Sequence, residues 1–544
     1  MGRRGLLGPA AVVAVLLAGH PLRAQTPQTP PPNGPRRIDP AWHALTGATV
    51  HVGPATVREK ATVVVREGRI VSVSAGPAPP GARVWDCAGR HVYAGFIDAY
   101  VEVDAPLPDP KTPGRHWNRG VTPERSALDG KGLDPKTAEA LRKMGFCAAA
   151  ISPKGGVFRG RAALVSLAAP DPDPSRPRPP LYADGVYGAV AFETAPRDEA
   201  RYPTSQMGAI ALIRQTLLDA DRRRMPGGDG GPDPRPPPSA LDALGPGTPL
   251  LFDTADELEA LRAARIGTEF GRRSILLGSG LEFRRLPAVA AAWSDVVVPL
   301  RFPEPPPVSS VGEADAVDLR TLMTWEQAPT NPRRLAAAGL RVSLTTSRLE
   351  QRPKFLEHLR TALRHGLGPD DALAMLTTRP AALLGVTDRL GTVEPGKIAD
   401  LVVCDGPVFA KKTKVLDVWI DGRRHEIHPP PEPELEGEWT ITLDPPVEGD
   451  RGLKIGSGPE ITVRAGDRTV KARDVRYADR RLHFVFDHTD FGEAGFFTMS
   501  AVLEGGVLRG HGVRASGRRF GWTATRRPGS GGEQEPAEEE ETAP

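Results

Sequence analysis

The sequence predicts an α/β protein built around a (β/α)8, TIM-like barrel, followed by an all-β module. Three observations lead to this fold class. Apolar runs alternate with helix-like segments from about residue 96 to about 386, strand-like patterns lie on both sides of that region, and short alternating strands fill residues 437–527. Alternating strands and helices imply a parallel sheet, and a region of about 290 residues suits a closed barrel with insertions. An open doubly wound sheet is the alternative, although no Gly-rich dinucleotide loop follows a strand.

The first 24 residues have the pattern of a secretory signal peptide. Arg3 and Arg4 give a positive start, residues 6–18 form a short apolar run, and Ala24 precedes the expected cleavage site. The run is shorter than the roughly 20 apolar residues that a membrane span needs, so cleavage is favoured over membrane anchoring. We therefore expect export to the periplasm or the exterior, with no transmembrane segment in the mature chain. Residues 25–41 are expected to be a Pro-rich linker.

Bulk composition limits the range of functions. The chain has 544 residues, too many for one ordinary core, and so predicts several domains. Its net charge of +3 is small for this length, so neither a nucleic acid nor an anionic membrane is expected as the main partner. Cys87, Cys147 and Cys404 are too few for a disulfide framework and are expected to be buried free thiols.

The order of elements follows from the apolar pattern. Two tracts rich in proline and glycine, 169–180 and 225–238, cannot bury a core and are expected to be flexible loops. Strand-like patterns also fill 42–94 and 389–428. Within the α/β region the expected strands are 146–152, 248–254, 273–279, 295–301 and 341–347, and the expected helices are 205–224, 255–271, 352–366 and 369–378.

The C-terminal part is predicted to contain a linker, a β module and a tail. Residues 429–436 form a Pro-rich linker, and 437–527 form a β-barrel-like module. "GEW" at its start and "GWTATRR" at its end resemble lipocalin-like barrels, in which a Trp on the first strand packs near an Arg on the last. Such barrels can bind apolar ligands, and the same stacking can also close a small core. Residues 528–544 are expected to be an acidic, disordered tail.

Two motifs carry a family resemblance. "GRHVYAGFIDAYVEVD" (89–104) and "LTTRPAALLGVTDRLGTVEPGKIADLVVCDG" (376–406), the latter followed by "VWIDGRR" (418–424), resemble the imidazolonepropionase-like branch of the amidohydrolase superfamily. The resemblance covers about residues 44–428. It implies a composite β-sandwich from 42–94 and 387–428 around a barrel at 95–386. It also implies hydrolysis of non-peptide carbon–nitrogen bonds with zinc or another divalent metal, and it is compatible with a homodimer.

The resemblance also locates the expected pocket. Active relatives hold metal with His-x-His after the first strand, often Lys or Glu after the fourth, His after the fifth and sixth, and Asp after the eighth. Here Tyr100 and Glu102 replace the two histidines, Ser347 or Thr346 replaces the Asp, and no histidine occurs from Trp117 to Glu357. The metal ligands are therefore predicted to be degenerate, with no metal or other cofactor bound. The pocket positions are Asp98, Tyr100, Glu102, Thr346 and Ser347, and His116 is the one histidine expected to reach them.

Two other arrangements of charged residues are compatible with the sequence. Asp98, Glu102 and Asp104, with Asp253 and Glu282 after later strands, could form an all-oxygen site for Mg²⁺ or Ca²⁺. Tyr100 filling the metal's volume is the simpler expectation. Lys154, Arg159 and Arg161 could hold an anion, although a turn between two strands is the commoner explanation of their segment. No catalytic residue can be assigned.

Three functions remain open from the sequence. The first is a degenerate family member that binds a small molecule without hydrolysing it. The second is a hydrolase acting through an unrecognised site, for example Asp98, Glu102 and His116. The third is a structural or interaction protein of the cell envelope.

Overall fold

The computed structural model describes most of the chain from residue 42 to residue 527. The described ranges are 42–109, 111–169, 181–196, 201–225, 238–429, 435–446, 449–456, 460–478, 480–489, 494–504 and 506–527. The predicted signal peptide (1–24), the linker 25–41 and the acidic tail (528–544) lie outside these residues, as do most of the tracts 169–180, 225–238 and 429–436. Within the described residues, no helix is both long and apolar enough to cross a bilayer.

One eight-stranded sheet combines segments from both sides of the α/β region. Its order is β18-β17-β16-β5-β1-β2-β3, with β4 paired to β1. β16 runs antiparallel to β5, with Val403 opposite Val92, and both side chains are fully buried. The strands are β1 (Trp42–Gly53), β2 (Thr56–Arg66), β3 (Arg69–Ser74), β4 (Arg83–Asp86), β5 (His91–Ala94), β16 (Leu401–Cys404), β17 (Val415–Ile420) and β18 (Arg423–Glu426).

The α/β region contains two hydrogen-bonded sheets. The first has the order β10-β9-β7-β6, and the second has the order β15-β14-β13-β12-β11-β8. Neighbouring strands from β11 to β15 are parallel, as are β6 and β7. The strands are β6 (Phe96–Val103), β7 (Phe146–Pro153), β8 (Phe158–Arg161), β9 (Ala163–Ser166), β10 (Leu181–Ala183), β11 (Gly188–Ala191), β12 (Leu250–Asp253), β13 (Ser274–Leu277), β14 (Asp295–Pro299) and β15 (Arg341–Thr345).

The two sheets share one apolar interior. Ala148 and Ala150 of β7 lie in the same buried cluster as Leu251 of β12 and Leu277 of β13. Alternate residues of the same strands, such as Ala149, pack in a second cluster with the surrounding helices. Strands buried on both faces explain the continuous apolar runs in the sequence. The α/β class is therefore confirmed, whereas closure into a barrel stays a prediction.

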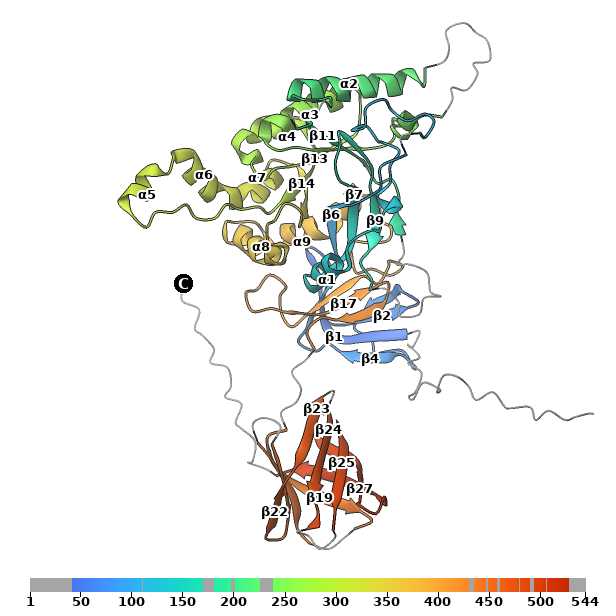
Figure 1. Cartoon of the computed structure of the whole chain (residues 1–544), viewed down its shortest axis with the longest axis vertical. Helices are drawn as coiled ribbons and strands as arrows, with labels where there is room; N and C mark the ends of the chain where they lie inside the picture. The colour runs from blue at the N-terminus through green and yellow to red at the C-terminus, as the bar shows by residue number, and fades with distance from the viewer. Residues whose placement is uncertain are drawn as a thin grey trace, which may run out of the picture.

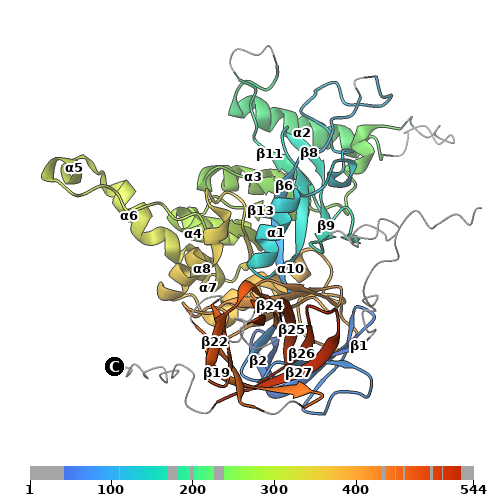
Figure 2. The ribbon, with the colours of Figure 1, turned by 60° about the horizontal axis from the view of Figure 1, so that its bottom comes forward.

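Ten α-helices are found in the described residues. Ser205 and Asp256 cap α2 and α3, where their side chains accept hydrogen bonds from Gly208 N and Glu259 N. α5 and α6 project from the body (Figures 1 and 2) and have no buried residue. The helices are α1 (Pro135–Lys143), α2 (Gln206–Arg222), α3 (Glu257–Glu269), α4 (Leu286–Ala292), α5 (Val311–Ala316), α6 (Leu319–Gln327), α7 (Asn331–Ala337), α8 (Phe355–Arg364), α9 (Pro369–Leu376) and α10 (Thr378–Leu383).

The C-terminal module is a nine-stranded antiparallel sheet in which the first strand pairs with the last (Figure 1). Inward side chains such as Phe484 and Trp522 form its buried core. Leu435, in the segment predicted as a linker, also packs there. The Arg526 guanidinium lies 5.2 Å from the centre of the Trp439 ring. The strands are β19 (Gly437–Asp444), β20 (Arg451–Ile455), β21 (Ile461–Ala465), β22 (Arg468–Lys471), β23 (Arg473–Ala478), β24 (Arg481–Asp487), β25 (Phe496–Glu504), β26 (Val507–Val513) and β27 (Arg519–Arg526).

Candidate functional site

Asp98 on β6 connects that strand to the end of β15. The Asp98 carboxyl is fully buried, and its Oδ2 accepts hydrogen bonds from Thr346 N at 3.0 Å and Thr346 Oγ1 at 2.6 Å. Its Oδ1 accepts one from Tyr100 N at 3.2 Å. Burial raises the pKa of Asp98, and these hydrogen bonds oppose the rise. Asp98 and Thr346 therefore join the edges of the two sheets, and both carboxylate oxygens of Asp98 accept hydrogen bonds within the protein.

The hydroxyl groups at the end of β15 are also used within the protein. Thr345 Oγ1 and Ser347 Oγ both donate to the carbonyl oxygen of Tyr100, at 2.6 Å and 2.7 Å. Ser347 is one of the two candidates for the position where active relatives carry a metal-binding Asp. Because its hydroxyl is turned towards the β6 backbone, this position serves to pair the strands.

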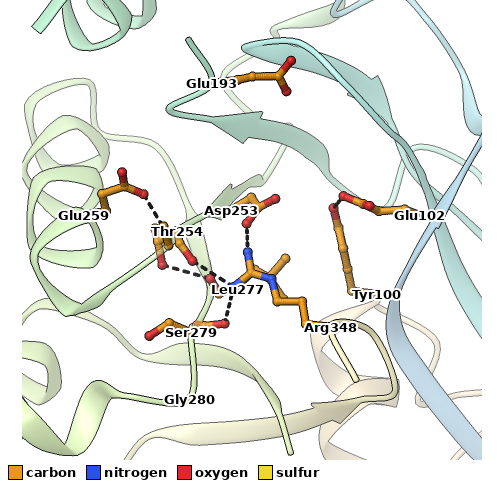
Figure 3. Close-up of polar contacts among 12 residues, drawn as sticks. Tyr100, Glu102, Glu193, Asp253, Thr254, Glu259, Leu277, Ser279, Gly280 and Arg348 are labelled. Carbon is orange, nitrogen blue, oxygen red and sulfur yellow. Dashed lines mark hydrogen bonds and ion pairs between the residues drawn. The ribbon is translucent and has the colours of Figure 1, made fainter. Parts of the chain in front are cut away.

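Arg159 of β8 lies at the centre of the site. Its Nη1 donates to Tyr100 Oη at 3.0 Å, to Glu102 Oε1 at 2.9 Å and to Asp253 Oδ2 at 2.7 Å. Tyr100 Oη in turn donates to Glu102 Oε1 at 2.8 Å, a contact visible in Figure 3. Burial raises the pKa of Tyr100 well above its usual range, so the phenol is neutral. One guanidinium therefore binds residues from β6 and β12 together.

Arg348, directly after β15, supplies the second guanidinium. Its Nη2 pairs with Asp253 Oδ1, and its Nη1 donates to the carbonyl oxygens of Thr254 and Gly278, both at 2.8 Å (Figure 3). Those carbonyls follow β12 and β13. Arg348 also has a backbone φ of 64°, a left-handed conformation that is unfavourable for residues other than glycine. The strained residue thus carries its positive charge to the ends of two neighbouring strands.

Glu193, just after β11, completes the group. It accepts a hydrogen bond from Gly156 N at 2.9 Å and lies 3.7 Å from Arg159 Nη2. The side chains of Glu102 and Glu193 are 43% and 46% exposed, whereas that of Arg159 is 10% exposed. The five charged groups, hereafter the mouth cluster, carry one net negative charge. They are Glu102, Arg159, Glu193, Asp253 and Arg348.

Two buried polar atoms next to this cluster have no hydrogen-bond partner among the residues that the structure describes. They are Ser152 Oγ and Arg159 Nε. Ser152 is fully buried and lies opposite Glu102 in the β6–β7 register. Buried polar groups in native proteins almost always have a protein, water or ligand partner. Both atoms are buried, so the described residues leave these two donors unsatisfied.

The divalent metal implied by the resemblance does not fit these residues. Glu102 and Asp253, the carboxylates nearest the expected ligand positions, bind guanidinium groups. Across the described ranges, no group of three or more His, Cys, Asp or Glu side chains is arranged to hold a metal ion. The two arginines already neutralise these carboxylates at the strand ends.

The remaining candidates lie elsewhere. His116 is 9% exposed, and its Nδ1 accepts a hydrogen bond from Asn118 N at 3.1 Å. No hydrogen bond or ring contact of the described chain joins His116 to Asp98 or Glu102. Glu282 accepts hydrogen bonds from Ser279 N at 2.6 Å and Asn331 Nδ2 at 2.7 Å, so it orders a loop. Asp104 pairs with Lys154 at 2.8 Å.

Sequence reasoning missed two members of the mouth cluster. Glu193 follows the strand pattern of "GAVAFE", and an acid after the fourth strand could have been found from the resemblance. Arg348 gave no comparable signal, because its role depends on carbonyl groups far away in the sequence. Arg159 was considered as part of an anion site, and the structure shows it bound to the protein's own carboxylates.

Comparisons with known proteins complete the description of the site. The sequence model of the Amidohydrolase family matches residues 329–424. The amidohydrolase tasK of Hapsidospora irregularis is 43% identical over 58 residues, and the match spans 11% of this chain and only 6% of that relative. The crystal structure of an amidohydrolase from Thermotoga maritima MSB8 is 22% identical, with a TM-score of 0.56 over 70% of this chain and 98% of that one. The structural likeness establishes a shared fold.

Proposed function

We propose that this chain is a member of the amidohydrolase superfamily, whose sequence model matches residues 329–424, and that it keeps the family's fold as a binding protein but has lost metal-dependent hydrolysis. In this proposal the strands β6 to β15 form a closed barrel of the imidazolonepropionase-like branch, and the protein is exported. The family match supports hydrolase ancestry. The hydrogen bonds and ion pairs of the mouth cluster support the loss of the metal.

The observation that carries the proposal is the bridging guanidinium of Arg159. It contacts Glu102 and Asp253 at once, at 2.9 Å and 2.7 Å. A metal ion would have to displace it, which would leave a buried arginine without its partners. Removing one member of a buried ion pair costs roughly 3–5 kcal/mol. No histidine from this region can bind a metal and so offset that cost, since the sequence has no histidine from Trp117 to Glu357.

We further propose that the ligand is a small molecule with a cationic nitrogen and a polar acceptor. The half-exposed carboxylates of Glu102 and Glu193, with the net negative charge of the mouth cluster, favour an ammonium or guanidinium group. We also propose that Ser152 Oγ and Arg159 Nε, which are buried and have no partner among the described residues, donate to an acceptor on the same molecule when it binds. A compact ligand that carries both groups could pair with the carboxylates and accept hydrogen bonds from the two donors.

Two measurements test this function. Elemental analysis of the purified protein should find no stoichiometric transition metal. A thermal-shift screen should find stabilisation by primary amines or guanidines that carry a carbonyl group, and less by their uncharged isosteres. Glu193→Gln should weaken that stabilisation, whereas Glu269→Gln, which alters an exposed ion pair on α3, should not. Full occupancy by zinc with metal-dependent cleavage of a lactam or amide would show that the chain is a working hydrolase.

A further inference from the structure

The outward face of strands β23–β27 in the C-terminal module carries an excess of positive charge. Arg476 on β23 lies opposite His483, His483 opposite Ser500, and Ser500 opposite His511 on β26. In the next row Arg481 lies opposite Val502, which lies opposite Arg509. The side chains of this basic face are Arg473, Arg476, Arg481, His483, Arg509, His511 and Arg519.

Four of these arginines have no internal partner. Arg476, Arg481, Arg509 and Arg519 are exposed, and their side chains form no hydrogen bond or ion pair with any other residue that the structure describes. The opposite side of the module differs. There Arg464 pairs with Asp450 at 2.7 Å and Lys471 pairs with Glu460 at 2.9 Å. The four arginines on the basic face therefore differ from Arg464 and Lys471, whose charges are compensated.

Acidic residues of the same strands lie at the margins of the basic face. Asp487 ends β24 and Glu504 ends β25. Asp474 lies beside the irregularity in register at the start of β23. The central rows contain only basic, hydroxyl and apolar side chains facing outward, so they present a surface suited to a flexible polyanion.

The chain itself supplies a polyanion of suitable length. Residues 533–541 have the sequence "EQEPAEEEE", and they follow β27, one edge of the basic face, within a few residues. Glu538 follows Arg527 by 11 residues, which can extend up to roughly 36–40 Å. The five strands are crossed in roughly 19 Å, four spacings of about 4.8 Å. The glutamates can therefore reach each of the five strands.

We propose that the acidic C-terminal segment, residues 533–541, docks on the basic face of its own module. Each exposed ion pair contributes little. The tether nevertheless holds the segment at an effective concentration on the order of millimolar, so several weak pairs suffice. Docking of this kind covers the basic face against other polyanions and is weakened by salt, because exposed charges are screened over about 10 Å at 0.1 M ionic strength.

A peptide-binding experiment tests the docking. The probe is a fluorescent peptide of residues 528–544, added to the full chain and to a chain that ends at Arg527. Fluorescence anisotropy should show binding to the truncated chain, and binding to the full chain should be ~10-fold weaker or more, because the tethered segment competes. Binding to the truncated chain should fall steeply between 50 and 300 mM NaCl.

Charge reversals locate the binding surface. In the truncated chain, Arg476→Glu with Arg509→Glu should abolish peptide binding. Lys454→Glu with Arg464→Glu makes the same change in net charge on β20 and β21 and should leave most of the binding intact. Circular dichroism checks that each variant is folded. Equal binding to the full and truncated chains, or equal loss in both double variants, would overturn the proposal. Binding of heparin but not of the peptide would show that the C-terminal segment does not occupy the basic face. It would indicate that this face binds a polyanion from outside the chain.

Discussion

Arg159 Nη1 lies 2.7 Å from Asp253 Oδ2, and both side chains are nearly buried, at 10% and 12% exposure. This pair connects β8 to β12, two strands of the same sheet that are separated by β11. Its environment differs from that of the other ion pairs at the surface, such as Arg214 with Glu269, whose side chains are 52% and 40% exposed. Loss of the buried pair should therefore lower the free energy of unfolding much more than loss of the exposed pair.

Replacement of Arg159 by methionine should strongly destabilise the protein. The change leaves the buried Asp253 carboxylate with Arg348 as its one remaining guanidinium, so the loss should approach but not exceed the roughly 3–5 kcal/mol of a fully broken buried pair. Urea denaturation measures the free energy of unfolding. Arg214→Met should cost less than about 1 kcal/mol, because its pair is exposed. Similar values for the two variants would show that Arg159 does not hold the site together.

Two substitutions of Arg348 should reveal the backbone strain at this residue. Arg348→Ala and Arg348→Gly lose the same side-chain contacts, but only glycine relieves the positive φ of 64°. The glycine variant should therefore be more stable than the alanine variant by roughly 1 kcal/mol. The order should reverse at Arg360 in α8, where glycine costs about 1 kcal/mol relative to alanine. A stability order at Arg348 that matches the order at Arg360 would contradict the strain.

Restoring the two histidines of the family motif should not restore metal binding. In Tyr100→His with Glu102→His, Arg159 and Arg348 still pair with Asp253, and the later imidazole ligands are still missing. We expect far less than one zinc per chain after dialysis, measured by elemental analysis. One tightly held zinc per chain would show that a metal ion displaces the two arginines despite their contacts.

Asp400 should make stability depend on pH. Burial raises its pKa from 3.8 to about 7, although it accepts hydrogen bonds from Tyr182 Oη and Asp421 N. The folded chain thus holds a proton between about pH 4 and pH 7 that the unfolded chain has released. The contribution to stability is fully present below about pH 4 and is lost as the pH rises to about 7.

Asp400→Asn should remove this dependence. The difference in unfolding free energy between the original chain and the variant should decline from pH 4 to pH 7 by on the order of 1 kcal/mol per pH unit. Denaturation at several pH values measures it. Asp405→Asn, at an exposed position on the same segment, is the control. A constant difference across this range would show that Asp400 is ionised in the folded chain.

Much of the fold was predictable, because its signals are local. The apolar runs expected at 146–152, 248–254, 273–279, 295–301 and 341–347 correspond to β7, β12, β13, β14 and β15. The strands β8 to β11, between Phe158 and Ala191, were not predicted, because none of them has the run of three large apolar residues found in β12, β13 and β14. Helices α5 and α6 were missed because they bury no side chain.

The site was only partly predictable. The positions of Tyr100 and Glu102 followed from the motif, and the structure brings them together at 2.8 Å. Their partner Arg159 came from a segment that a simple turn also explained. The role of Arg348 depends on its hydrogen bonds to the carbonyl oxygens of Thr254 and Gly278, each at 2.8 Å. Such long-range hydrogen bonds have no signature in a single sequence.

The pairing of β19 with β27 also brings the two ends of the C-terminal module together. Arg527 N donates to the carbonyl oxygen of Glu438 at 2.7 Å, so the polypeptide enters and leaves this unit at one point. A unit with adjacent ends can be transplanted as a cassette into a surface loop of an unrelated host without stretching either protein. It can equally be circularly permuted by a short bridge between its ends and a new opening at one of its hairpins.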